Sequence, residues 1–172
     1  MKTLTLNESL DWCREGGIEL DRSSPRVPPV GEANALRLAL PAKASRLTWF
    51  SRVVEESIQP WERCLLLVTG WGVWASSENW HLYYRLRQSY GDKRLLEEAP
   101  GHLFLGFEAN DLVSFLELGL VFGWDMHVVP AGGYGRVFIS HDEWIQFVMT
   151  DQSKVTELKA SLRDACGAPL TA

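Results

Sequence analysis

The chain has 172 residues and a formal net charge of −5 at pH 7, because its 22 Asp and Glu residues outnumber its 17 Lys and Arg residues. This length suffices for one domain with an ordinary hydrophobic core. Nucleic-acid affinity depends on clustered Lys and Arg, so the acidic balance argues against a nucleic-acid partner, although it leaves room for a local basic patch. We therefore expect a single globular domain over 1–172 that binds no nucleic acid.

Cysteine usage and the lack of targeting segments indicate a cytoplasmic protein. The three Cys residues are far apart and have no C-x-x-C spacing, which is typical of reduced thiols and not of a disulfide framework. The first residues, MKTLTLNESLDW, lack the apolar core of a signal peptide, and no run approaches the roughly 20 apolar residues of a spanning helix. We expect a cytoplasmic location and no membrane contact.

The first third of the chain predicts two helices and one strand. A short helix over 7–14 is followed by a Gly-, Ser- and Pro-rich segment at 16–33, which is typical of a surface connection. The alternating residues 34–40 predict a strand that Pro41 ends. Apolar residues then recur every three or four positions over 45–59, which predicts an amphipathic helix.

The middle of the chain alternates strands and helices. The continuous apolar run at 64–69 predicts a strand that is buried on both faces. A helix over 76–90 follows, with an apolar and a polar stripe, and Gly91 closes it. A strand at 102–107 leads into a helix from about 110 to 122, which is apolar nearly all round and is expected to be deeply buried.

The last part predicts an antiparallel hairpin and an amphipathic helix. Two strands at 124–129 and 136–140 flank the turn-rich sequence PAGGYG. Residues 144–149 fit either a helix or a strand, and 153–165 has the spacing of an amphipathic helix. The order is then αβαβαβαββα, which predicts an α/β fold. We expect a mixed, mostly parallel sheet of about five strands, covered by helices, with the final hairpin antiparallel.

The segment 70–75, GWGVWA, satisfies the G-x-G-x-x-A pattern of dinucleotide-binding folds after a predicted strand and before a predicted helix. The cap-forming residues Ser76 and Ser77 start that helix beyond the motif, so its N-terminus would not point at a bound pyrophosphate. Dinucleotide-binding folds also carry an acidic residue about 20 positions after the glycines. Asp92 is acidic and lies at about this distance, but no predicted strand leads to it. We interpret the glycines as a strand end followed by a tight turn and expect no cofactor.

A dense set of metal-ligand or acid–base side chains lies near the predicted hairpin: Asp125, His127, His141, Asp142 and Glu143. Pairing Val128 with Val137 and Met126 with Ile139 would place Asp125 and His127 on one face and His141 on the other. A three-ligand site then fails, and we expect no bound metal. In this interpretation His127 lies on a solvated strand face, and Ser140 or Asp142 caps the segment that starts near Glu143.

Catalytic motifs are not apparent in the sequence. Cys64 lies at the start of a predicted buried strand and Cys166 at the end of a predicted helix, and buried thiols are usually inert. No G-x-S-x-G elbow or H-E-x-x-H helix occurs. A catalytic site could still form from residues that are distant in the sequence and meet only in the folded protein. The sequence therefore leaves enzymatic activity uncertain and favours a non-catalytic protein.

The segment 70–84 holds three of the eight Trp residues and two of the four Tyr residues. Trp and Tyr combine a large apolar area with a polar group, so they dominate recognition where they reach the surface and pack equally well in a core. His81 and Arg85 lie one helical turn apart and could add polar contacts, although a merely solvated helix face is the alternative. The candidate binding residues are Trp71, Trp74, Trp80, His81, Tyr84 and Arg85.

Two function classes fit this sequence. The first is a non-catalytic protein-interaction or regulatory domain that recognises a partner through an aromatic-rich surface, including the hairpin tip at 130–135 as a second option. The second is a small enzyme or small-molecule-binding protein with a pocket at the strand end around 70–81. Exposed tryptophans on a convex patch would favour the first class, and a concave pocket containing His81 would favour the second.

Overall fold

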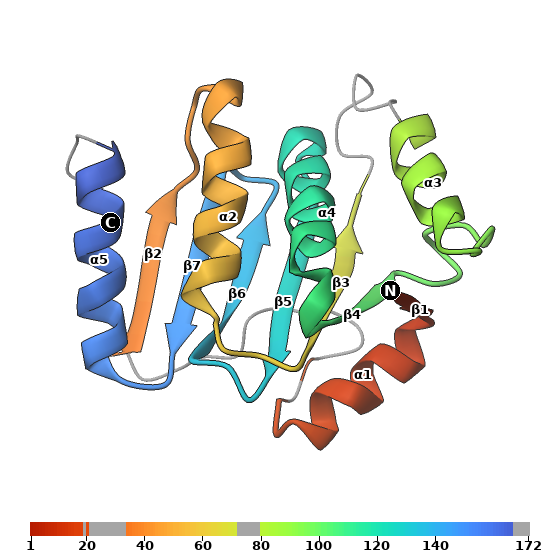
Figure 1. Cartoon of the computed structure of the whole chain (residues 1–172), viewed down its shortest axis with the longest axis horizontal. Helices are drawn as coiled ribbons and strands as arrows, with labels where there is room; N and C mark the ends of the chain where they lie inside the picture. The colour runs from red at the N-terminus through yellow and green to blue at the C-terminus, as the bar shows by residue number, and fades with distance from the viewer. Residues whose placement is uncertain (19, 21–33, 72–79, 167–172) are drawn as a thin grey trace.

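In the computed structural model the described residues are 1–18, 20, 34–71 and 80–166, with side chains described up to 162. Within them the chain forms one seven-stranded sheet of order β1-β4-β3-β5-β6-β7-β2 (Figure 1). The strands are β1 (Lys2–Leu4), β2 (Ala35–Ala39), β3 (Arg63–Gly70), β4 (Gly101–Leu105), β5 (Asp125–Ala131), β6 (Gly135–Ser140) and β7 (Trp144–Met149). The helices are α1 (Leu6–Glu15), α2 (Leu47–Ser57), α3 (Trp80–Ser89), α4 (Ala109–Phe122) and α5 (Gln152–Cys166), with short 3-10 turns η2 (Ala44–Arg46) and η3 (Gly106–Glu108).

The prediction of a mostly parallel sheet of about five strands is wrong, because every neighbouring pair in the seven-stranded sheet is antiparallel. The helical crossovers do connect strands that run in the same direction, as in β2–α2–β3 and β4–α4–β5. Those strands are not neighbours, however, since β3 lies between β4 and β5, and three strands lie between β2 and β3. Apolar periodicity predicts the elements and the crossovers, but not which strands form hydrogen bonds with each other.

The predicted hairpin is confirmed with its register. Met126 lies opposite Ile139 and Val128 opposite Val137, as the apolar alternation requires. Residues 144–149, whose sequence fits either a helix or a strand, form strand β7 between β6 and the edge strand β2. The short strand β1 was not predicted, because three residues are too few for a periodic pattern. Most of the predicted connection at 16–33 lies outside the described residues.

Helices cover the sheet unequally. α2 and α4 lie side by side over one face, with α5 and α3 toward the two edges (Figure 1). The main hydrophobic core lies beneath them and includes Leu66 of the internal strand β3. Leu65 and Leu67 point to the opposite face, where they cluster with Cys13 of α1. β3 is therefore buried on both faces, as its continuous apolar run predicted, with Leu65 and Leu67 fully buried.

α4 is among the deeply buried helices, as its composition predicted. Its buried residues are Leu112, Val113, Phe115, Leu116, Gly119, Leu120 and Phe122. A Cβ atom at Gly119 would lie 2.1 Å from Met126 Sδ, so glycine allows the helix to pack closely against β5. Gly123 ends the helix in the left-handed conformation, with φ 64°. None of the described helices combines the length and apolar character needed to cross a bilayer.

Candidate functional site

Helix α3 packs against the rest of the protein through one face, which carries Trp80, Tyr83 and Arg87. The spacings of three and four residues place these side chains on the same side of the helix. Tyr83 and Arg87 are fully buried. The Trp80 ring lies 5.5 Å from the ring of Trp124 in the core and stacks on Tyr84 at 6.0 Å. These contacts fix the position of α3 against the sheet and the start of β5.

The predicted aromatic recognition residues are partly engaged in this packing. Trp71 and Trp80 are half-buried, and both pack against the main core. Tyr84 is also half-buried, and its hydroxyl accepts a hydrogen bond from the backbone N–H of Leu96 at 3.1 Å. Trp74 lies outside the described residues. The structure thus brings Trp80 and Tyr84 together as a stacked pair whose inner sides contact the core.

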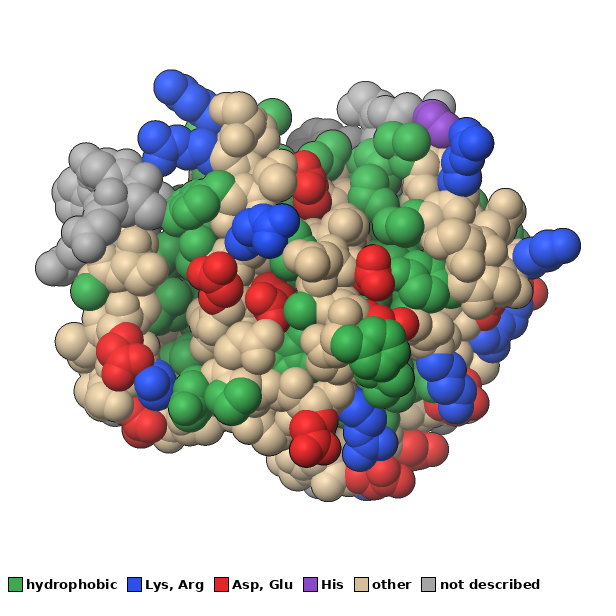
Figure 2. All heavy atoms as spheres, in the orientation of Figure 1, with side chains coloured by type: hydrophobic (Ala, Val, Ile, Leu, Met, Phe, Trp, Pro, Cys, Tyr) green, Lys and Arg blue, Asp and Glu red, His purple; other side chains and the backbone are tan. Residues whose placement is uncertain are grey.

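The predicted polar residues lie on the outer face of α3. His81 and Arg85 are exposed, one helical turn apart, and Leu82 beside them is 49% exposed. Figure 2 shows a His side chain and Lys or Arg side chains over α3, at the upper right of the view. This outer face is polar and cationic with an apolar centre, and it is presented by a helix whose inner face is fixed.

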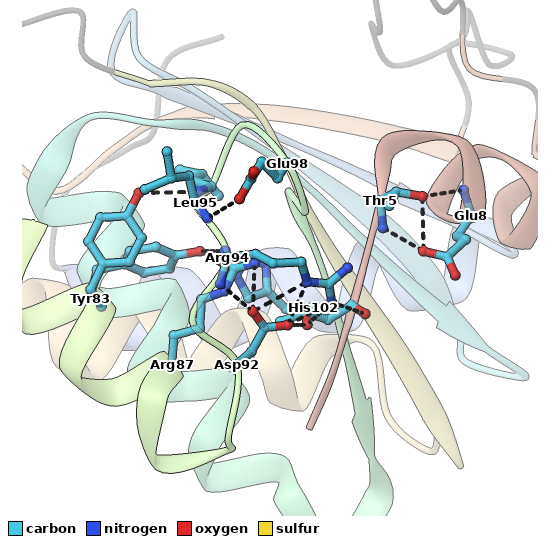
Figure 3. A network of polar contacts seen from close by, with 12 residues as sticks. Thr5, Glu8, Tyr83, Arg87, Asp92, Arg94, Leu95, Glu98 and His102 are labelled. Carbon is cyan, nitrogen blue, oxygen red and sulfur yellow. Dashed lines mark hydrogen bonds and ion pairs between the residues drawn. The ribbon is translucent and has the colours of Figure 1, made fainter.

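Beneath α3 lies a buried chain of hydrogen bonds that links Arg87, Tyr83 and His102 (Figure 3). Arg87 Nη1 donates to the Tyr83 hydroxyl oxygen at 2.6 Å. The Tyr83 hydroxyl lies 2.8 Å from His102 Nε2, and His102 Nδ1 lies 3.3 Å from the carbonyl oxygen of Leu66. A guanidinium only donates and a carbonyl only accepts, so the direction of every bond is determined. Tyr83 donates to Nε2, and His102 carries its proton on Nδ1.

His102 is neutral in this arrangement. Burial, reinforced by the positive charge of Arg87, lowers its pKa to about 3. Burial also raises the pKa of Tyr83. Neither group changes its protonation near neutral pH, and each has its polar atoms engaged. The chain of bonds therefore orients α3 on β3 and β4, and it is poorly suited to general acid–base catalysis.

Asp92, in the loop after α3, connects this network to the surface. Arg94 donates to its carboxylate through Nη2 at 2.6 Å and Nε at 3.0 Å, and the backbone N–H of Arg94 donates at 2.7 Å. The Thr3 hydroxyl of β1 also donates to it. The hydrogen bonds from Arg94 lower the pKa of Asp92, so this carboxylate stays ionised. The loop after α3 is thereby fixed to β1.

The guanidinium of Arg87 is incompletely satisfied. Its Nη2 lies 3.7 Å from Asp92, which is an ion-pair distance but not a hydrogen bond. Its Nε and Nη2 are buried and make no hydrogen bond with any residue that the structure describes. Buried donors of a charged group without acceptors are costly, and each one requires a physical explanation. The side chain points from α3 toward Asp92 (Figure 3).

A cavity of about 480 Å³ opens beside this network, between β1 and the loop after α3. Its lining residues are Met1, Lys2, Thr3, Tyr90, Gly91, Asp92, Lys93 and Arg94. A second cavity, of about 390 Å³, lies between α2 and α5 and includes Tyr134, over whose ring the Lys154 ammonium lies at 4.3 Å. Neither of these cavities is lined by residues of the predicted pocket at 70–81.

Asp125 and His141 lie together beside the end of β3, against the sequence prediction that the hairpin register separates them. His141 Nδ1 lies 2.9 Å from both carboxylate oxygens of Asp125. The prediction is wrong because His141 follows Ser140, the last paired residue of β6, so strand alternation no longer applies to it. The expected solvated position of His127 is wrong as well, since this side chain is buried on β5. A Cβ atom at Gly70 would lie 2.5 Å from Asp125 Oδ2, so glycine makes room for this pair.

His141 faces carboxylates on both sides of its ring, because its Nε2 lies 3.3 Å from Asp142. The hydrogen bond with Asp125 raises the pKa of His141. No group of three potential ligands that could hold a metal occurs in the described part of the chain, and the expectation of a metal-free protein stays a prediction. The Ser140 hydroxyl accepts from the backbone N–H of Asp142 at 3.2 Å, in a strand-to-strand turn and not at a helix start.

Sequence reasoning missed the residues of the buried network: Arg87, Asp92, Arg94 and His102. Arg87 had a recognisable signal, since it lies four residues after Tyr83 on the apolar stripe of its helix, where a cation is unusual. Asp92 and Arg94 gave no signal, because they become neighbours of Thr3 only through the pairing of β1 with β4.

Comparison with protein-family models, with curated proteins and with solved structures gives no match for this chain.

Proposed function

We propose that the protein is a non-catalytic binding domain that recognises an acidic protein partner with the outer face of α3. The carrying observation is the composition of this helix. Its sequence WHLYYRLRQS contains no Asp, Glu or Lys, in a chain with 22 acidic residues. Of its five Trp, Tyr or Arg residues, Arg85 is exposed on the outer face, and Trp80 and Tyr84 are half-buried beside it. Trp, Tyr and Arg are enriched at protein interfaces, whereas Asp, Glu and Lys are depleted.

The surroundings of the helix support this proposal. The inner face is fixed by Tyr83, Arg87 and the Trp80 stack, so an incoming partner would meet a helix that is already in place and little backbone freedom would be lost on binding. The outer face offers Leu82 as an apolar contact, with Arg85 beside it as a cation and His81 as a further polar contact. A partner with a complementary acidic surface is favoured, since opposite potentials steer association.

The test uses the full chain as bait and one charge-reversal variant. Arg85→Glu changes the outer face of α3, and Lys159→Glu is the matched control, because Lys159 is equally an exposed helical cation on α5 at the far edge of the sheet (Figure 1). The partner that wild type captures is identified and purified. The Kd of its complex is then measured with wild type, with Arg85→Glu and with Lys159→Glu. We expect Arg85→Glu to weaken binding about tenfold or more, and Lys159→Glu to change it little.

Two results would refute the proposal. In the first, the purified partner binds wild type and Arg85→Glu equally. In the second, both variants lose affinity to the same extent, which would indicate a response to net charge and not to the face of α3. Matching unfolding midpoints of the three proteins ensure that the comparison concerns folded molecules.

The alternative, a catalytic or ligand pocket at the end of β3, is favoured by one observation, the Asp125–His141 pair beside Gly70. A carboxylate that orients a histidine is common in active sites. In such a pair the second ring nitrogen is directed to the reacting group, whereas here it faces Asp142. The carboxylates of Asp125 and Asp142 both favour the protonated ring of His141, and a protonated ring cannot act as a base. The catalytic alternative therefore ranks second.

A further inference from the structure

The cavity between β1 and the loop after α3 is lined by more cationic than acidic side chains. Lys2, Lys93 and Arg94 line it, and Asp92 is the acidic side chain among its lining residues. Lys2 and Lys93 are exposed, and neither makes an ion pair with a residue that the structure describes. In a chain with a net charge of −5, this cavity is a local concentration of cations.

Asp92 does not neutralise these lysines, because its carboxylate is engaged by other groups. Arg94 donates to it from the guanidinium and from the backbone, and the Thr3 hydroxyl adds another bond. These interactions point the Asp92 carboxylate toward Arg94 and Thr3. The ammonium groups of Lys2 and Lys93 therefore remain available to an external anion.

Arg87 adds a buried positive charge directly behind the wall of the cavity. Its guanidinium is fully buried, and among the described residues its nearest carboxylate is that of Asp92 at 3.7 Å. Two of its nitrogens, Nε and Nη2, have no hydrogen-bond acceptor among the described residues. A buried charge is screened weakly, so its field reaches across Asp92 into the cavity and favours a second negative charge there.

We infer that this cavity is an oxyanion-binding site, with Lys2 and Lys93 as contact residues and Arg87 as a buried source of positive potential, and that its ligand carries a phosphate group. A phosphate group has several acceptor oxygens and up to two negative charges, so it suits two exposed lysines at one cavity better than a single carboxylate does. The volume of about 480 Å³ admits a phosphate group together with a small organic substituent. The site is distinct from the outer face of α3, so the two proposals can fail independently.

The test is calorimetric titration of the full chain at constant ionic strength with inorganic phosphate, phenyl phosphate and acetate. Lys93→Gln removes one exposed contact cation that makes no ion pair within the described part of the chain, and Lys159→Gln on α5 is the matched control. We expect saturable phosphate binding, about tenfold weaker in Lys93→Gln and unchanged in Lys159→Gln, with acetate much weaker than phosphate. Tighter binding of phenyl phosphate than of phosphate would assign the ligand to phosphorylated small molecules, and equal binding would assign it to the free ion.

The inference is overturned if neither phosphate nor phenyl phosphate binds saturably to wild type. It is also overturned if Lys93→Gln and Lys159→Gln bind phosphate alike, because the anion would then respond only to general charge. Lys2→Gln serves as a second variant with the same expectation as Lys93→Gln, since both side chains line the cavity.

Discussion

Replacing Tyr83 with Phe tests whether the buried network fixes α3 to the sheet. The hydroxyl of Tyr83 accepts from Arg87 at 2.6 Å and donates to His102 at 2.8 Å. Its removal leaves an acceptor on a buried neutral imidazole and a donor on a buried guanidinium without partners. An unsatisfied buried group costs about 1–3 kcal/mol, so Tyr83→Phe should reduce the free energy of unfolding by about 2–5 kcal/mol.

Tyr84→Phe provides the control at the neighbouring position of the same helix. Its hydroxyl accepts a single bond, from the backbone N–H of Leu96, at a partly buried site. The expected loss is about 0.5–1.5 kcal/mol. Urea unfolding at pH 7 measures both variants, and the midpoint of Tyr83→Phe should fall by roughly 1–2 M. If Tyr83→Phe lost no more stability than Tyr84→Phe, the network would not be what holds α3 in place.

Three further expectations follow from the packing and the ionisable groups. Leu116→Ala, in the buried α4, should lower the free energy of unfolding by about 2–5 kcal/mol in urea, and an unchanged midpoint would contradict its burial. The hydrogen bond with Asp125 raises the folded-state pKa of His141. This interaction therefore stabilises the folded protein fully below about pH 6.5, the pKa of an unfolded-state histidine. Its contribution is lost as the pH rises through the folded-state pKa. Wild type should therefore exceed His141→Gln in urea midpoint at acidic pH and converge with it at alkaline pH; a constant difference would argue against the pair. Elemental analysis of protein purified without added metal should find no stoichiometric zinc, and one zinc per chain would contradict this expectation.

The sequence predicted the type and approximate range of most described elements, because their apolar residues follow the period of a helix or a strand. The buried strand at Leu65–Leu67 and the hairpin register at Val128 are examples in which burial itself produces the pattern. Strand order was predicted wrongly, since an apolar strand such as β3 can accept either parallel or antiparallel neighbours with the same residues. The helical crossovers suggested parallel neighbours, and the sheet instead places β3 between β4 and β5.

The candidate site was predictable only in part. His81 and Arg85 were correctly expected on the polar stripe of a helix, because helical spacing determines the face. Trp80 could not be assigned to surface or core from its type alone, and its contact with Trp124 depends on how α3 approaches β5. The cavity joins Thr3 to Asp92 across 89 positions of sequence, a contact that no local pattern encodes.

The most direct test of the central claim is to map the partner on the protein. The captured partner is titrated into isotopically labelled protein, and the backbone amide shifts are followed by NMR. We predict that the largest shifts occur at His81, Leu82 and Arg85, on the outer face of α3. Shifts centred on the cavity between α2 and α5, or on the edge strand β2, with α3 unaffected, would contradict the claim that α3 is the recognition helix.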